Sequence, residues 1–260
     1  MKQIKIYFCD FWANFDLSDN FILRELNREF QVVIDAVNPE IVFFSCFGQL
    51  HLEFHSTKVF LTGENVRPDF NLCDYAIGFD RLQFGDRYLR FPNFAWDDIE
   101  DLTGERRNPV TIDDIQSRLF CNFIYSNGGA DPARDKFFKL LNKFKKVDSL
   151  GHHLRNTTSD ISLRNSENWA QSKLEIQSNY NFTIAFENSS TPGYVTEKII
   201  HAFRVRSIPI YYGDPDIELQ FDKNSFISVR DFASLEDCAR YVCSVSEDPD
   251  KMLNYLNASV

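Results

Sequence analysis

The stretch NFTIAFENSSTPGYVTEKIIHAFRVRSIPIYYGD, residues 181–214, decides the fold of this chain. Its first part, 182–186, is an apolar run of strand length with β-branched and aromatic residues. A polar loop follows at 187–193, and 195–206 then carries apolar residues at helical spacing. A second buried strand is predicted at 208–212, ending in a glycine. The pattern is a strand–loop–helix–strand unit, and such units bind ligands at the carboxyl ends of their strands.

The first turn of the predicted helix carries charges that suit a nucleotide. Tyr194 or Thr196 would stand near its N-terminus, followed by Glu197 and Lys198. Backbone N–H groups are unpaired there and the helix dipole is positive, so this end attracts phosphate. Lys198 adds a positive charge, whereas the Glu197 carboxylate suits ribose hydroxyls. The alternative is a capped surface helix with adjacent Glu and Lys, which is common, and the pattern alone leaves both open.

Three segments of this stretch form a longer signature. They are Phe-Glu-Asn-Ser at 186–189, Tyr-Val-Thr-Glu-Lys at 194–198 and Ile-Pro-Ile-Tyr-Tyr-Gly at 208–213. Together they resemble the donor-binding signature of the α-1,3/4-fucosyltransferases, which transfer fucose from GDP-fucose to oligosaccharides. The resemblance implies an α/β fold of the GT-B type, in which two Rossmann-like domains face each other across a cleft.

Composition narrows the function classes. The 260 residues suffice for one large or two modest domains, and the net charge of −10 argues against nucleic-acid binding as the main task. Six cysteines are scattered without zinc-ligand spacing, which favours reduced thiols in a cytoplasmic protein. The N-terminus reads as a strand rather than a signal peptide or a membrane-spanning segment. Animal members of the resembled family are anchored in the Golgi by an N-terminal helix, so the resemblance implies a bacterial-type member or a shortened chain. We expect it in the cytoplasm, with peripheral contact at the inner membrane left open.

The rest of the chain alternates between strands and helices, as an α/β protein with largely parallel sheets does. Strands are predicted at 2–9, 31–35, 41–46, 58–62, 75–79, 88–91, 119–125, 147–150 and 226–229. Helices are predicted at 18–30, with Asp16 or Ser18 as the cap, and at 131–145, 166–177, 235–245 and 248–256. The polar stretch 93–118 is the expected connection. The resulting domains are 1–115, to which the resemblance assigns acceptor binding, and 116–260, to which it assigns GDP-fucose binding.

Glu64 is the candidate catalytic residue. It lies in Thr62-Gly63-Glu64-Asn65 at the end of a predicted strand, where catalytic groups of α/β proteins are found. A glutamate is also common in plain loops, so this position alone is weak evidence. Residues 62–90 are similar, however, to a family segment whose Glu is assigned as general base. The resemblance thus implies that Glu64 accepts the proton of the acceptor hydroxyl as it attacks fucose.

Arg155 is the candidate phosphate ligand. A loop arginine is usually only solvated, but the resembled family has an Arg-Asn pair here that supplies a phosphate contact, and a guanidinium can pair with two phosphate oxygens. The neighbouring His152 and His153 could ligate a metal, but no third ligand stands at a suggestive spacing. Asp214-Pro215-Asp216 reads as a structural turn rather than a metal motif. No metal and no cofactor are predicted, and GDP-fucose is the co-substrate.

The resemblance implies further donor-site residues. Tyr194 would contact the diphosphate or ribose, Glu187 would lie near the fucose, and Asn188 belongs to the same loop. The resemblance also implies nucleotide contacts at Ser126 and Asn127, although the match is looser there, and the residues themselves favour helix capping for Ser126 or Asn127.

The signature and the Glu64 segment together predict an inverting fucosyltransferase that uses GDP-fucose. The resemblance implies that the acceptor is a GlcNAc hydroxyl of an N-acetyllactosamine-type oligosaccharide, giving an α-1,3 linkage of the Lewis x type, with a Lewis a linkage left open. Such a product would belong to protein glycosylation or a lipopolysaccharide O-antigen. One alternative is a glycosyltransferase of the same fold with another donor or acceptor. The other is a non-catalytic nucleotide-sugar-binding module, which the joint presence of Glu64, Arg155, Glu197 and Lys198 argues against.

Overall fold

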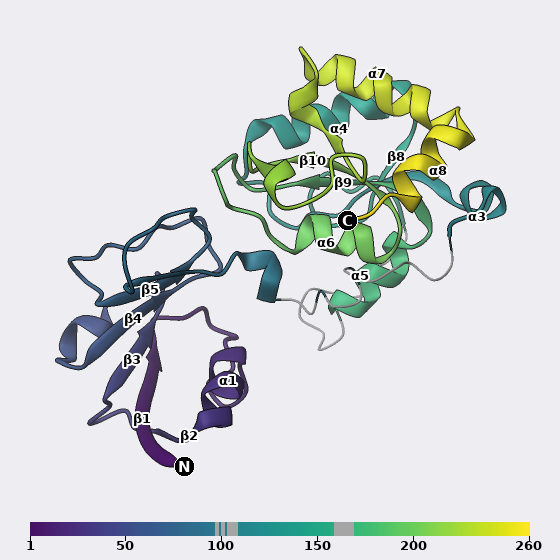
Figure 1. Cartoon of the computed structure of the whole chain (residues 1–260). Coiled ribbons are helices and arrows are strands. Elements are labelled where there is room, and N and C mark those ends of the chain that lie inside the picture. The colour runs from purple at the N-terminus through teal and green to yellow at the C-terminus, as the bar shows by residue number, and fades with distance from the viewer. Residues whose placement is uncertain (97–98, 100–101, 103–108, 159–168) are drawn as a thin grey trace. The chain divides into compact units, whose positions relative to one another are not determined.

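The computed structural model describes residues 1–96, 99, 102, 109–158 and 169–260. They belong to two compact units, Met1–Trp96 and Asp97–Val260, each built on one parallel β-sheet (Figure 1). The predicted α/β class with two parallel-sheet domains is thereby confirmed. Much of the connection expected at 93–118, and the predicted helix residues 166–168, lie outside the described residues.

The first unit contains a six-stranded sheet in the order β2-β1-β3-β4-β5-β6, with every described pairing parallel. Its strands are β1 (Lys2–Cys9), β2 (Phe30–Ile34), β3 (Ile41–Phe44), β4 (Thr57–Leu61), β5 (Tyr75–Gly78) and β6 (Tyr88–Arg90). Helix α1 (Phe21–Glu29) and the 3₁₀ turns η1 (Leu50–Glu53) and η2 (Asn93–Trp96) complete it. All six strands occur where the apolar runs predicted them, because a parallel sheet covered on its faces requires nearly continuous apolar strands.

The start of α1 corrects one prediction. Neither Asp16 nor Ser18 caps the helix; Asn20 does, and its side chain accepts a 3.0 Å hydrogen bond from the Leu23 backbone N–H. Asp16 instead accepts from the backbone N–H of Ser18 at 2.7 Å. This turn of the Asx type keeps the chain out of the helix until Asn20.

The second unit contains a five-stranded parallel sheet in the order β11-β10-β9-β7-β8. Its strands are β7 (Leu119–Phe123), β8 (Val147–Ser149), β9 (Tyr180–Phe186), β10 (Ile208–Tyr212) and β11 (Ile227–Ser228). Its helices are α3 (Ile112–Ser117), α4 (Pro132–Phe144), α5 (Trp169–Gln177), α6 (Glu197–Arg204), α7 (Leu235–Ser246) and α8 (Pro249–Asn257), with 3₁₀ turns η3 (Ile217–Leu219) and η4 (Val229–Asp231). Helices α4 and α7 cover one face of the sheet, and α5 and α6 the other (Figure 1).

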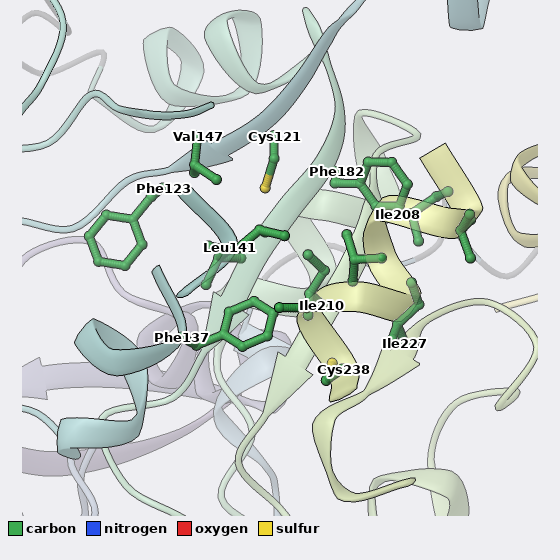
Figure 2. Close-up of a cluster of buried hydrophobic side chains, with 14 of the residues drawn as sticks. Cys121, Phe123, Phe137, Leu141, Val147, Phe182, Ile208, Ile210, Ile227 and Cys238 are labelled. Atoms are coloured by element: carbon green, nitrogen blue, oxygen red, sulfur yellow. The ribbon is translucent and has the colours of Figure 1, made fainter. Parts of the chain in front are cut away.

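The core of this unit lies between the sheet and α4, α7 and α8. All seven residues of β9 are buried, as expected for a central strand with both faces covered. Figure 2 shows side chains from both layers meeting there, among them Phe137, Leu141, Phe182 and Ile210. Each such side chain contributes about 1.5–3 kcal/mol when fully buried, so this core holds the sheet rigid beneath its loops.

Candidate functional site

The N-terminus of α6 is fixed by a residue that directly follows the preceding strand. Thr196, one of the two residues predicted to lie near this N-terminus, is the N-cap residue. Helix α6 begins at Glu197, two residues later than predicted. The backbone N–H and the hydroxyl of Thr196 each donate a 2.8 Å hydrogen bond to the carboxylate of Glu187. These bonds hold Thr196 in an extended conformation and thereby delay the first helical turn.

Glu187 is the anchor of this arrangement. It follows β9, its side chain is 0% exposed, and its backbone N–H donates to the Tyr212 carbonyl at 2.7 Å. Its carboxylate also accepts from Lys198 Nζ at 3.1 Å. Gly213 makes room for it, because an added Cβ would lie 2.6 Å from Glu187 Cγ and 2.4 Å from the hydroxyl of Tyr211. With its oxygens occupied by Thr196 and Lys198, Glu187 serves the site through these neighbours.

Lys198 and Glu197 form the partly open surface of the cluster. Their side chains are 16% and 35% exposed, and Lys198 Nζ lies 3.8 Å from Glu197 Oε1. Burial lowers the pKa of Lys198, but the carboxylates of Glu187 and Glu197 outweigh it and raise this pKa above its ordinary value. Burial likewise opposes ionisation of Glu197, yet Lys198 and Lys173 lower its pKa to about 2. The first turn of α6 therefore presents an ammonium and a carboxylate that are both charged at neutral pH.

Tyr194 and Asn188 lie in the loop between β9 and α6. Tyr194 is buried, and its backbone N–H donates to the Thr191 carbonyl at 3.1 Å, directly after Gly193 at φ 82°. Asn188 is exposed, and its backbone carbonyl accepts from the N–H of Asp131 at 2.8 Å. The loop is thus held at both ends, with the Asn188 side of it open to solvent.

Arg134 joins two of the loops, which the sequence did not reveal. It is 1% exposed, and its guanidinium lies 4.3 Å above the Tyr125 ring. It donates to the Asn127 carbonyl, and at 3.3 Å to the side-chain oxygen of Asn188. The Tyr125 hydroxyl in turn accepts from the Phe186 N–H at 2.7 Å. Arg134 consequently connects the loops after β7 and β9. An isolated Arg in a helix gives no sequence signal for this role.

Arg155 is carried by a loop that packs on the end of β7. At Gly151 an added Cβ would lie 2.0 Å from the Tyr125 carbonyl oxygen, so only glycine allows this approach. His153 donates from its backbone N–H to the same carbonyl at 2.9 Å, and its Nε2 lies 2.8 Å from both oxygens of Asp135. The histidine considered as a metal ligand therefore pairs with a carboxylate and anchors the loop. Arg155 is exposed beyond it.

Ser126 and Asn127 lie on the exposed turn after β7. The Asn127 side chain accepts a 2.8 Å hydrogen bond from the Gly129 N–H, which closes a turn. The cap of α4 is Asp131, as predicted from the Asp-Pro pair, and its carboxylate also accepts from the Tyr212 hydroxyl at 2.8 Å. Neither Ser126 nor Asn127 caps α4, so the capping role that the residues favoured is wrong.

Glu64 belongs to the first unit, on the turn after β4. Its side chain is exposed, and its backbone N–H donates to the Thr62 hydroxyl at 3.2 Å. The turn is fixed a second time by Asn93, whose side chain donates to the Gly63 carbonyl at 2.6 Å. This geometry presents a carboxylate to solvent at the carboxyl edge of the first sheet.

The described residues form neither a metal-binding cluster nor a membrane-spanning helix. Among these, no three His, Cys, Asp or Glu side chains group so as to hold a metal ion. Within the same part of the chain, no helix is long and apolar enough to cross a bilayer. Asp214 is buried and accepts from the Asp216 N–H at 3.0 Å, so this pair forms the structural turn that the sequence predicted.

The second unit thus gathers its candidate residues at one edge. Because its strands are parallel, the segments after β7, β8, β9 and β10 and the N-terminus of α6 all meet at the carboxyl end of the sheet. Cationic groups beside a helix N-terminus can bind a diphosphate, and the ionised Glu197 can accept from hydroxyls.

Two family models match the chain over nearly its whole length. One, described as alpha-(1,3)-fucosyltransferase FucT N-terminal domain, matches residues 6–96. The other, described as glycosyltransferase family 10 (fucosyltransferase) C-term, matches residues 116–258.

Individual proteins similar to this chain are also fucosyltransferases. The alpha-(1,3)-fucosyltransferase FucT of Helicobacter pylori is 32% identical over 92% of this chain. The match covers 56% of the length of that relative. Human GDP-fucose protein O-fucosyltransferase 3 is 32% identical over 70% of the chain and 38% of its own length. A crystal structure of an alpha1,3-fucosyltransferase with GDP-fucose superposes with a TM-score of 0.80 at 26% identity, over 100% of this chain and 83% of that one.

Proposed function

Because the chain belongs to glycosyltransferase family 10, the fucosyltransferases, we propose that it transfers L-fucose from GDP-fucose to a GlcNAc hydroxyl of an N-acetyllactosamine-type oligosaccharide. The product carries an α-1,3 linkage of the Lewis x type, formed with inversion at the anomeric carbon. The observation that carries this proposal is the charged first turn of α6, where Lys198 and Glu197 stand at the carboxyl edge of a parallel sheet.

The proposed reaction is a single displacement. The acceptor oxygen forms a bond to the anomeric carbon of fucose as the bond from that carbon to the β-phosphate oxygen breaks. Glu64 takes the proton of the acceptor hydroxyl, and the bonding electrons leave with GDP. Arg155 and Lys198 offset the charge that gathers on the diphosphate, and Glu197 binds the ribose hydroxyls.

The remaining assignments complete the donor site. Tyr194 lines the diphosphate–ribose region, and the exposed turn with Ser126 and Asn127 contacts the nucleotide together with Asn188. Glu187 belongs to the site as the group that holds Lys198 in place. The first unit supplies the acceptor surface.

A second candidate acceptor is a serine or threonine hydroxyl of a polypeptide. It is supported by the similarity to a protein O-fucosyltransferase over 70% of the chain. The donor chemistry at α6 would be the same, because only the nucleophile changes.

Mass spectrometry of transfer reactions tests both candidates. The protein is incubated with GDP-fucose, GDP-mannose or UDP-galactose, and with N-acetyllactosamine, lacto-N-biose or a serine-containing peptide, in the presence of either EDTA or Mn²⁺. We expect one deoxyhexose on N-acetyllactosamine from GDP-fucose alone. Transfer to the peptide instead would select the second acceptor, and transfer from another donor would overturn the assignment of GDP-fucose.

A further inference from the structure

A buried lysine lies behind the first turn of α6. Lys173, on α5, is 7% exposed, and its Nζ is 3.1 Å from His201 Nδ1. An ammonium can only donate, so in this hydrogen bond Nδ1 is the acceptor. Lys173 Nζ is also 3.9 Å from Glu197 Oε1.

Glu197 therefore lies between two ammonium groups. Lys198 is 3.8 Å from the same carboxylate oxygen, from its own helix, and Lys173 reaches it from α5. Both nitrogen–oxygen distances exceed the length of a hydrogen bond, so each contact is an ion pair without a short hydrogen bond. The side chain of Glu197 remains 35% exposed. The carboxylate is thus kept ionised by its neighbours while part of it still faces solvent.

We propose that Lys173 is a positioning residue of the donor site, which holds the Glu197 carboxylate charged and oriented for the ribose hydroxyls and is itself held by His201. This inference rests on the proposed function, because it needs a nucleotide whose ribose meets Glu197. Lys173 does not touch the nucleotide in this role. It acts through Glu197.

The cost of burying Lys173 supports a role beyond packing. An ammonium loses much of its hydration when it is buried, and its pairing seldom does more than offset this loss. An apolar side chain would fill the same space between α5 and α6 without that cost. The lysine instead adds positive charge beside the residue whose pKa is lowered to about 2.

The test compares GDP with 2′,3′-dideoxy-GDP by calorimetry, for the wild type and Lys173→Met. We expect Lys173→Met to weaken the binding of GDP about tenfold, which is the effect of losing one charged hydrogen bond. Binding of the dideoxy nucleotide should weaken less than about twofold. KM for GDP-fucose should rise similarly with little change in kcat, and Lys173→Arg should restore most of the affinity. Lys139→Met, which removes an exposed lysine of α4, is the matched control.

Equal weakening of both nucleotides, or none, would overturn the inference, because a purely structural lysine cannot distinguish the ribose hydroxyls. Thermal unfolding of Lys173→Met beside the wild type shows whether the region still folds. If the wild type itself binds neither nucleotide, the proposed function fails instead, so the two failures are distinguishable.

Discussion

The carboxyl edges of the two sheets carry their key carboxylates in opposite ways. In the first unit, the structure fixes the backbone around Glu64 through Thr62 and Asn93 and leaves its side chain exposed. In the second unit, Glu187 is fully buried and is bonded through its side chain to Thr196 and Lys198.

This difference matches what each group is proposed to do. A diphosphate binds best to charges already held in place, since the cost of ordering them is then met on folding. A general base must only reach a proton once the acceptor has bound, and its contacts can tighten at that stage. Substitutions at the two edges should therefore separate catalysis from stability.

The largest effect is expected at the first edge. Glu64→Gln removes the proton acceptor but keeps the shape, and should lower kcat about 10²–10⁴-fold. Because the side chain is exposed, the thermal midpoint and the affinity for GDP should stay as in the wild type. Steady-state kinetics, calorimetry and thermal unfolding measure the three quantities.

Glu53→Gln, at an exposed glutamate on η1 of the same unit, is the matched control and should leave kcat unchanged. If Glu64→Gln transferred fucose at the wild-type rate, the base would have to be another group.

A smaller effect with the opposite profile is expected at the second edge. Glu187→Gln leaves Lys198 without its buried counter-ion, which costs about 3 kcal/mol when one partner of a buried pair is lost. Denaturant unfolding should show this loss, and GDP should bind more weakly because Lys198 is no longer held. Glu236→Gln breaks an exposed pair with Arg240 on α7 and should cost less than about 1 kcal/mol. Equal stability of both variants would contradict the anchoring role of Glu187.

The sequence predicted the strands better than the buried charges. The apolar runs indicated the strands of both sheets, and the resemblance read from residues 181–214 is confirmed at the level of the family. The start of α6 was predicted two residues early because the bonds from Thr196 to Glu187 join residues nine positions apart across a loop. Local helix spacing contains no trace of such a bond.

Arg134 and Lys173 were missed for a related reason. Charged residues in helices are usually solvated. Only the fold shows that Arg134 packs on the Tyr125 ring and that Lys173 contacts His201 and Glu197. The catalytic and donor-binding roles of Glu64, Arg155 and Glu197 stay predictions.

The smallest effect concerns the pH dependence of stability at the second edge. The pKa of Glu197 is about 2 in the folded chain, below the ordinary value of 4.5 for a glutamate. A lowered pKa in the folded state means that the ionised group stabilises the fold above pH 4.5, and that this contribution disappears as the pH falls from 4.5 towards 2. We therefore expect the difference in thermal midpoint between the wild type and Glu197→Gln to be constant near neutrality and to shrink over that range. Other carboxylates titrate equally in both proteins and cancel in the difference. A difference that stayed constant down to about pH 2 would show that the two lysines do not hold this carboxylate charged.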